Sequence, residues 1–419
     1  MNVNKIIRSY FLYCLVFFSI SACNKDVEQL SIVGAIPPTG NTLEQILKNN
    51  PHDSLYYRLI VKSGQLSLLS SSDTRYTIFV TNNDSIKSFV SNYVFEHYGD
   101  QISPNASDSI YAQAIINYVS QEDAAKIVLY NVIPQSVTSA DMSAVFPNYF
   151  YPSAYNPIPT FSSFLRLTIF PSSRNGYWLN NIPMMSNDVF ASNGVIHHTD
   201  NLVLPPNQYI WDRINTDTSL AFLKAAINRA DSGTVAPGFL KSALLNIGAN
   251  LTIFAPTNQA FRTALTNAIG QFFISNDTSG SATPDAWFAF ASALSSSPSI
   301  FSNPNLFSVL SASRIKGILV YHVFGSRAFT NNFPTDTTYY QTLLNTDTAY
   351  TTHPGIQIKA IFGNKYVQSA TIKGVGNATP ANVIINQRPL MPLLIGTNDQ
   401  NYLNGVIHKI DQVLLPASL

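Results

Sequence analysis

The pentapeptide Asn-Gly-Val-Ile-His occurs twice in this chain of 419 residues, at 193–197 and at 404–408. An identical run at two such distant places indicates an internal duplication, because fixed self-similarity is the sequence signature of a repeated structural unit. The chain is therefore expected to fold as two copies of one domain.

Two further segments recur in the same order. Tyr-Thr-Ile-Phe at 76–79 corresponds to Leu-Thr-Ile-Phe at 251–254, and Leu-Tyr-Asn-Val at 129–132 corresponds to Val-Tyr-His-Val at 320–323. The offset between the copies grows from 175 (254 − 79) at the phenylalanines to 211 (408 − 197) at the histidines. The second copy is therefore longer and contains insertions.

These blocks resemble the fasciclin (FAS1) domain family. The family pattern Thr-x-Phe-Ala-Pro-Thr-Asn-x-Ala-Phe is matched at 252–261, a Tyr-His-Val block at 321–323, and Asn-Gly-Val-Ile-His-x-Ile-Asp-x-Val-Leu at 404–414. The resemblance covers most of residues 38–417. It implies an α+β protein of two tandem fasciclin-like domains, each a β-sandwich-like wedge flanked by small helices.

The first 22 residues are expected to be a lipoprotein signal peptide. Lys5 and Arg8 precede an apolar stretch at 10–20, which is too short to span a bilayer, since a spanning helix needs roughly 20 residues. Ile-Ser-Ala-Cys at 20–23 is similar to a bacterial lipobox, in which the cysteine receives the lipid. Cys23 is therefore the expected site of lipid attachment.

The alternative for Cys23 is an ordinary signal-peptide cysteine that cleavage discards. The only other cysteine, Cys14, lies inside the apolar stretch, so the mature chain would keep one cysteine and could form no internal disulfide. For this reason we prefer lipid attachment. Two or more acyl chains on one residue provide the multiple signals that stable anchoring requires. The membrane is thus an expected partner.

A tether is expected at 23–40, followed by domain one at 41–206 and domain two at 207–419. Lys-Asp-Val-Glu at 25–28 is similar to the export signal of surface lipoproteins in some Gram-negative phyla. It favours an outer-membrane protein on the cell surface over one on the periplasmic face. The plain alternative is that these charges only solvate the tether.

Composition and motifs exclude several classes of function. Charged residues make up 11% of the chain and the formal net charge is +1, so no basic patch indicates nucleic-acid binding. The chain has no His-Glu-x-x-His, no Gly-x-Ser-x-Gly, no phosphate-binding Gly-x-x-x-x-Gly-Lys and no cysteine pair for zinc. We therefore expect no enzyme, no catalytic residue, no cofactor and no metal site.

The doubled pentapeptide itself receives a structural interpretation. The Asn-Gly pairs at 193–194 and 404–405 predict β-hairpins with type I′ turns, because both residue types accept positive φ. His197 and His408 then lie on strand faces beside apolar neighbours. They are interpreted as buried, hydrogen-bonded residues rather than as ligands or bases.

The family resemblance adds an adhesion option. Tyr321 and His322 match a Tyr-His block that is linked to integrin adhesion in animal relatives, and Asp188 lies in a segment similar to another adhesive one. The preferred interpretation of Tyr321 and His322 is that they tie a buried strand to its neighbours. Domain one has Asn131 in place of the histidine, and Asp188 has no evident counterpart in domain two. Neither role is therefore expected in both copies.

The insertions are the better candidates for a binding surface, since binding loops are usually grafted on a scaffold. Aromatic rings there could stack on sugars, although the aromatics of the first candidate segment could equally be packing residues. The candidates are the segment 146–157 with Tyr149 and Tyr151, the segment 274–304 with Trp287, and the segment 387–403.

The expected function is adhesion or ligand binding at the cell envelope by a lipid-anchored pair of fasciclin-like domains, with a polysaccharide or another envelope protein as partner. The alternative is an accessory glycan-binding component of an outer-membrane nutrient-uptake apparatus.

Overall fold

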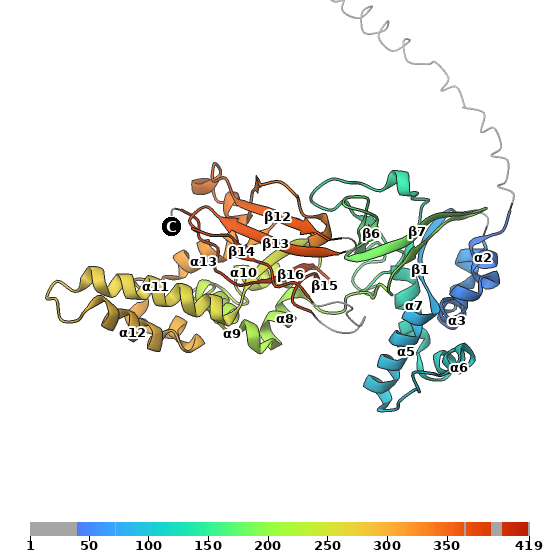
Figure 1. Ribbon diagram of the computed structural model, residues 1–419, viewed down its shortest axis with the longest axis horizontal. Coiled ribbons are helices and arrows are strands. Elements are labelled where there is room, and N and C mark those ends of the chain that lie inside the picture. Colours follow the sequence, from blue (N-terminus) through green and yellow to red (C-terminus); the bar gives the residue numbers. More distant parts are fainter. Residues whose placement is uncertain (1–39, 72, 364–365, 387–395, 418–419) are drawn as a thin grey trace, which may run out of the picture. The chain divides into compact units, whose positions relative to one another are not determined.

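The computed structural model describes residues 40–71, 73–363, 366–386 and 396–417. The predicted signal peptide, Cys23 and the predicted tether up to residue 39 lie outside the described residues, as do residues 387–395 of the third candidate segment. Asn41–Leu419 form one compact unit. Within it are two regions of helices and sheet, called here the N-terminal region (41–206) and the C-terminal region (207–419) (Figure 1).

The described α-helices of the N-terminal region all precede the long hairpin of its last two strands. Its helices are α2 (Leu43–Asn49), α3 (Ser54–Ser63), α4 (Leu66–Ser70), α5 (Asn83–Tyr98), α6 (Asp108–Tyr118) and α7 (Gln121–Tyr130). Its strands are β1 (Tyr76–Thr81), β2 (Val132–Ile133), β3 (Tyr151–Pro152), β4 (Thr168–Ile169), β5 (Pro171–Ser172), β6 (Trp178–Leu179), β7 (Ile182–Ala191) and β8 (Gly194–Thr199).

The C-terminal region repeats this plan with additions. Its helices are α8 (Ile210–Thr216), α9 (Ala221–Ala230), α10 (Phe239–Leu244), α11 (Asn258–Asn276), α12 (Pro284–Leu294) and α13 (Ala312–Tyr321). Its strands are β9 (Leu251–Pro256), β10 (Val323–Phe324), β11 (Thr338–Tyr340), β12 (Ile356–Phe362), β13 (Val367–Gly374), β14 (Ala381–Asn382), β15 (Gln400–Tyr402) and β16 (Gly405–Ile410).

The same four-strand arrangement occurs in both regions. The N-terminal sheet has the order β2-β1-β8-β7-β6-β5, and the C-terminal one β10-β9-β16-β15. In each region the strand that carries Val-Ile-His runs parallel to the first long strand and antiparallel to its hairpin partner. The register agrees as well, since Phe79 is paired with His197 and Phe254 with His408. The predicted α+β fold of two helix-plus-sheet regions is confirmed.

Each region has its own main core. One buried cluster is drawn from Leu43 to Leu202 and the other from Ile210 to Leu414. The predicted domain boundary at 206–207 falls between these two clusters, and the boundary itself stays a prediction. A second sheet of the C-terminal region, with the order β11-β12-β13-β14, contributes its inner face to the larger cluster.

Local signals explain several element boundaries. Thr42 begins α2 with a capping box to Gln45, and Thr257 begins α11 by accepting the amide of Ala260. The sequence predicts a helix over 55–69 that Gly64 interrupts, and the structure divides it in two at this glycine. The chain forms α3 and α4, because Gly64 adopts a left-handed conformation (φ 74°) that ends α3.

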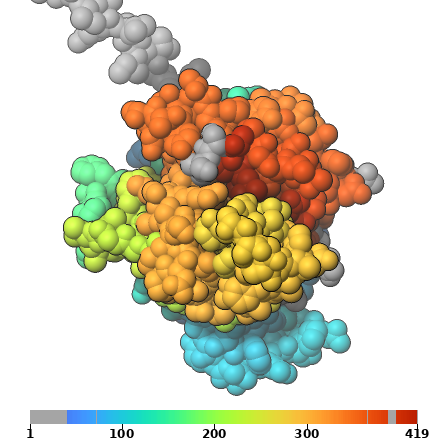
Figure 2. Space-filling model, turned by 90° about the vertical axis from the view of Figure 1, so that its left-hand side faces the viewer, coloured from blue at the N-terminus to red at the C-terminus, as the bar shows by residue number. Residues whose placement is uncertain are grey.

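The C-terminal region has a helical hairpin formed by α11 and α12. It projects from the body of the unit (Figure 1), and Figure 2 views the molecule from that side with these helices toward the viewer. Gly270 allows the close approach of the helices, since a Cβ there would lie 2.5 Å from the ring of Phe288. The offset between the two copies rises by 16 (191 − 175) across this part of the chain and by 20 (211 − 191) between Tyr321 and His408.

Candidate functional site

The repeated Asn-Gly pairs do connect hairpin strands, but the turn type differs from the prediction. Ala191 pairs with Gly194 and Tyr402 with Gly405, so the asparagine lies inside a two-residue connection and the glycine is already in the strand. Neither asparagine has positive φ, which excludes a type I′ turn. The prediction of hairpins is confirmed and that of type I′ turns is wrong.

Both asparagines are buried and bind backbone far away in sequence. Asn404 Oδ1 accepts the amide of Ile210 at 3.0 Å, and its Nδ2 donates to the carbonyl of Leu244 at 2.8 Å. Asn193 likewise accepts the amide of Leu43 at 2.8 Å and donates to the carbonyl of Leu69 at 2.8 Å. Each side chain therefore fastens the hairpin to the first helix of its region.

The two glycines of these pairs allow the last strand to approach the backbone of the first strand closely. A Cβ at Gly194 would lie 1.9 Å from the carbonyl oxygen of Tyr76, and one at Gly405 would lie 2.2 Å from that of Leu251. Contacts under 3 Å are not tolerated by real side chains, so only glycine fits where the last strand meets the first. The Asn-Gly pair thus combines a buried amide with a strand position that has no room for a side chain.

The two strand histidines are buried, and both ring nitrogens of each are used. His408 Nδ1 accepts the amide of Asp399 at 3.1 Å, and its Nε2 donates to the carbonyl of Ala328 at 2.9 Å. His197 repeats the arrangement, with the amide of Asp188 at 3.3 Å and the carbonyl of Val137 at 2.9 Å. Accepting at Nδ1 requires the neutral ring.

Burial lowers the pKa of both His197 and His408, which agrees with the neutral form. Each ring also stacks on the phenylalanine of the neighbouring strand, at a centroid distance of 5.4 Å for Phe79 and 5.9 Å for Phe254. These histidines hold the sheet together and have no ring nitrogen left to act as a base or to bind a metal.

Asp188 does have a counterpart in the second copy, which corrects the sequence-based expectation. Asp399 stands nine residues before His408, as Asp188 stands nine before His197, and the offset of 211 is the same (399 − 188). Both aspartates have positive φ, 60° and 52°. Asp188 accepts the amide and hydroxyl of Ser139, and Asp399 those of Thr330.

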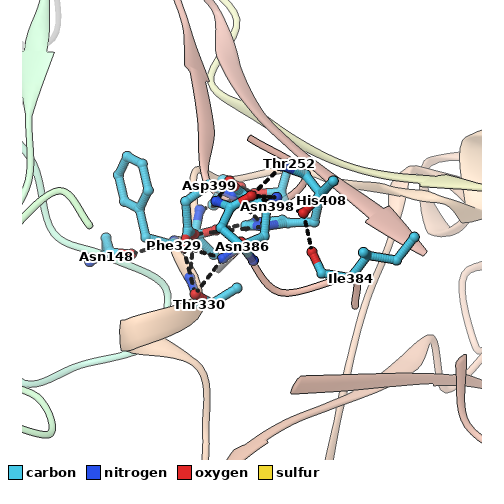
Figure 3. Close-up of polar contacts among 12 residues, drawn as sticks. Asn148, Thr252, Phe329, Thr330, Ile384, Asn386, Asn398, Asp399 and His408 are labelled. Atoms are coloured by element: carbon cyan, nitrogen blue, oxygen red, sulfur yellow. Dashed lines mark hydrogen bonds and ion pairs between the residues drawn. The ribbon is translucent and has the colours of Figure 1, made fainter. Parts of the chain in front are cut away.

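Figure 3 shows the more enclosed of the two copies, around Asp399. Its carboxylate accepts the amide of Thr330 at 2.7 Å and the hydroxyl at 2.6 Å, and Asn398 Nδ2 donates to it at 2.6 Å. Asn386 in turn binds Asn398, with its amide donating to Asn398 Oδ1 at 2.8 Å. Asp399 is 6% exposed, so this carboxylate is sealed by its own hydrogen bonds. Asp188 is only half-buried.

Tyr321 and His322, the Tyr-His block, are both buried. The Tyr321 hydroxyl donates to the carbonyl of Gly355 at 2.6 Å and accepts the amide of Val375 at 3.0 Å. His322 Nε2 accepts the amide of Leu414 at 2.8 Å. Burial raises the pKa of Tyr321 to about 12 and lowers that of His322 to about 4. Neither side chain can contact a partner in this conformation.

The segment 146–157 presents aromatic rings to solvent. Tyr149 and Phe150 are about half exposed, at 54% and 50%, and their rings are near-parallel (19°) with centroids 6.0 Å apart. Tyr151 is partly buried, meets Tyr149 edge-on at 5.3 Å, and donates from its hydroxyl to the carbonyl of Asp141 at 3.3 Å. Tyr149 and Phe150 are accessible, whereas Tyr151 supports them.

The side chain of Trp287 packs and forms a hydrogen bond within the α11–α12 hairpin. Its ring stacks on Phe273 at a centroid distance of 5.1 Å, and its Nε1 donates to Asp277 at 3.0 Å. Asp277 also accepts the backbone amides of Ser281 and Ala282, and these hydrogen bonds hold its pKa well below the usual range. Trp287 therefore fastens the connection between the two helices.

One buried residue escaped the sequence analysis. Arg327 is 2% exposed, and its guanidinium donates to Asn250 at 2.9 Å, to Asn401 at 2.7 Å and to the carbonyl of Leu403 at 3.2 Å. Burial lowers its pKa to about 10. No local pattern identifies such a residue, because its partners come from two distant segments, at 250 and at 401–403.

In the part of the chain that the structure describes, no group of three or more His, Cys, Asp or Glu side chains could hold a metal ion. The adjacent histidines His197 and His198 do not converge on one point, since His198 Nε2 lies 3.1 Å from the carboxylate of Asp53 and His197 Nε2 contacts the carbonyl of Val137. No helix among the described residues is long and apolar enough to cross a membrane.

The comparison with known protein families identifies one segment, in the N-terminal region. Residues 52–205 match the family model of the fasciclin domain. This part of the chain is therefore similar to a fasciclin domain. The C-terminal region has the same strand arrangement around its own Asp-His pair. The comparison with curated proteins gives no match.

Among solved structures, a FAS1 domain pair from the insect cell adhesion molecule Fasciclin I is similar, with 13% identity over 86% of this chain and 95% of that chain. Its TM-score is 0.30. A score this low carries no argument, so the similarity to a fasciclin domain rests on the family model alone.

Proposed function

We propose that this chain is a lipid-anchored cell-envelope protein that binds a polysaccharide or another envelope protein through its fasciclin-like regions. The similarity of residues 52–205 to a fasciclin domain supports a binding role, since such domains are associated with adhesion and binding. Both strand histidines and the aspartates paired with them form hydrogen bonds that stabilise the sheets. A binding site is therefore sought on the surface rather than in the buried motifs.

The observation that carries the proposal is an exposed aromatic surface without acidic residues. From 142 to 187 the sequence has no Asp or Glu and contains ten Phe, Tyr or Trp residues among 46. Phe161 and Phe164 are 71% and 90% exposed, in addition to Tyr149 and Phe150. Exposed aromatic groups on one segment mark interaction surfaces, since water disfavours leaving them uncovered.

The chemistry of this segment fits a hydroxylated, uncharged or anionic partner. The C–H face of a sugar ring is apolar and covers an aromatic ring well, while the ring edges keep their hydroxyl groups in water. Arg166 and Arg174 are the only charged residues between 142 and 187, so nothing there repels an anionic polymer. The exposed rings of this segment, called here the aromatic surface, are those of Tyr149, Phe150, Phe161 and Phe164.

Retention of the full chain on immobilised envelope polysaccharide and on a glycan array tests the proposal. Replacing Phe161 and Phe164 by Ala should weaken binding about tenfold or more, since each buried ring contributes roughly 1 kcal/mol or more to an interface. Phe95→Ala is the matched control, because Phe95 is 56% exposed but lies on α5. Equal loss in the control, or none in the double variant, would remove the aromatic surface from the proposal.

The lipid anchor is proposed at Cys23. The Cys23→Ala chain should leave the membrane fraction and appear in the soluble fraction, because the acyl chains provide the attachment. Continued fractionation with membranes would refute lipidation at this residue. Display on the cell surface is tested by adding protease to intact cells, and protection of the chain from cleavage would place it on the periplasmic face.

A further inference from the structure

The sheet β11-β12-β13-β14 has one face in the core and one toward solvent. Alternate residues of its two central strands are buried, among them Ile356, Ile358 and Ile372. The side chains between them point outward, because successive residues of a strand alternate between faces. The outward face therefore belongs to Gln357 and Lys359 on β12 and to their neighbours on β13.

A groove of about 310 Å³ lies on this outward face. Its polar lining consists of two lysines, three hydroxyl residues and one amide, with no carboxylate among the lining residues. These are Lys359, Lys373, Thr337, Ser369, Thr371 and Gln357.

The strand register sets the two lysines close together. Lys359 is paired with Thr371, and Gln357 with Lys373, so the lysines are diagonal neighbours across β12 and β13. Diagonal neighbours on one face lie roughly 7–8 Å apart. Like charges at this spacing repel each other, and an anion between them relieves the repulsion.

Neither lysine is neutralised within the described part of the chain. No ion pair or hydrogen bond of Lys359 or Lys373 occurs among its residues, whereas Lys409 pairs with Asp217 at 2.7 Å. The nearby carboxylate of Asp411 is taken up by Asn382, which donates to it from both backbone and side chain at 2.7 Å. The groove thus holds two positive charges that a ligand can reach.

We propose that this groove binds an anionic polysaccharide, with a carboxylate or sulfate of the polymer between Lys359 and Lys373. The hydroxyls of Ser369 and Thr371 both donate and accept, as sugar hydroxyls require. Tyr339 lies directly across from Gln357 and is 45% exposed, so its ring can cover a sugar face at the end of the groove. The inference rests on the proposed function and deepens it by naming a ligand class and a second site.

An acidic peptide fits this surface less well. Peptides commonly add a strand to a free sheet edge, where backbone hydrogen bonds provide the affinity. The groove lies over β12 and β13, which are flanked by β11 and β14, so the backbone beneath it is already paired. Recognition here must come from side chains that bind charge and hydroxyl groups.

Titration calorimetry of the full chain in a neutral detergent tests the groove with three polymers. Polygalacturonate carries carboxylates and hydroxyls, dextran hydroxyls alone, and polyglutamate carboxylates on a peptide. We expect binding of polygalacturonate that weakens with salt, and much weaker binding of the other two. Equal or tighter binding of dextran or polyglutamate would overturn the proposal.

Lys359→Gln and Lys373→Gln should each weaken polygalacturonate binding roughly fivefold, and the double variant roughly 25-fold, since one partly exposed ionic contact is worth up to about a factor of five. Lys48→Gln, an exposed lysine on α2, is the matched control and should bind as the parent does. Thermal unfolding of each variant verifies that folding is unchanged. Unchanged binding by the double variant would refute the groove.

Failure of the groove and failure of the proposed function give different results. If the double lysine variant is retained on envelope polysaccharide as well as the parent, the groove is wrong and the proposed function stands. If the parent itself is retained on no envelope component, the proposed function fails, and with it the groove as a site for an envelope polysaccharide.

Discussion

The buried amide of Asn404 is the most informative residue to perturb. Its side chain is fully buried and connects the hairpin of β15 and β16 to the amide of Ile210 and the carbonyl of Leu244. Asn404→Ala removes both hydrogen bonds without removing the turn. Two buried backbone groups from distant segments then have no partner.

The size of the effect follows from these two groups. Each buried polar group left unpaired costs about 1–3 kcal/mol, so the variant should lose about 3 kcal/mol of stability. For a region of this size that corresponds to a fall of roughly 6–12 °C in Tm. Asn193→Ala should cost more, about 4 kcal/mol, because Asn193 binds a third backbone group, the carbonyl of Ser71.

Urea unfolding measures the loss, and hydrogen exchange locates it. The amide of Ile210 should lose its protection in Asn404→Ala, since its acceptor is gone, while amides of the N-terminal region keep theirs. Asn267→Ala is the control, because Asn267 is exposed on α11 and its removal should change stability by less than about 0.5 kcal/mol. A loss below about 1 kcal/mol in Asn404→Ala would refute the reasoning.

Three other predictions concern stability and local order. Gly405→Ala should destabilise the C-terminal region by several kcal/mol in urea unfolding, because the new Cβ would lie 2.2 Å from a carbonyl oxygen of β9. The control Gly280→Ala has open space around the new Cβ and should cost only about 1 kcal/mol. His322 has a folded pKa of about 4, below the value of about 6.5 for an unfolded histidine. Below pH 6.5 the unfolded chain therefore binds more protons than the folded one. The stability of the protein falls as the pH drops from about 6.5 to about 4. The loss of stability attributable to His322 should reach about 3 kcal/mol near pH 4. Urea unfolding at pH 7 and at pH 4.5 measures it, and the difference in stability between the two pH values should be smaller in His322→Gln than in the parent. In the exposed control His52→Gln this difference should equal that of the parent. In the α11–α12 hairpin, Trp287→Phe should keep the ring stack and only partly expose the connection to limited proteolysis, while Trp287→Ala should expose it fully; equal cleavage of both would show that the stack contributes nothing.

The repeated blocks predicted the scaffold well, because they record local requirements of a strand or a cap. Thr257 caps α11, the doubled histidines lie in buried strands, and both Asn-Gly pairs join hairpins. The turn type was not predictable, since the side chains of Asn193 and Asn404 accept hydrogen bonds from backbone amides more than 100 residues away. A local turn rule does not contain such partners.

Residues outside the repeated blocks were harder to predict than the scaffold. The sequence analysis missed Asp399, although Asn187-Asp188 recurs as Asn398-Asp399 and the constant spacing of nine residues to the histidine identifies it. The alternation of Lys359 with buried isoleucines was also visible in the sequence. Its closeness to Lys373 depends on the register of β12 and β13, which the sequence does not state.

The position of the last strand has a consequence for the order in which this chain can fold. β16 lies between β9 and β15, although it follows β9 by about 150 residues, so its addition closes the longest loop in the sheet. During synthesis, one side of β9 stays unpaired until residues 405–410 have emerged. A chain stalled before that point would expose an adhesive strand edge, and chaperones that hold nascent or translocating polypeptides would have to cover it.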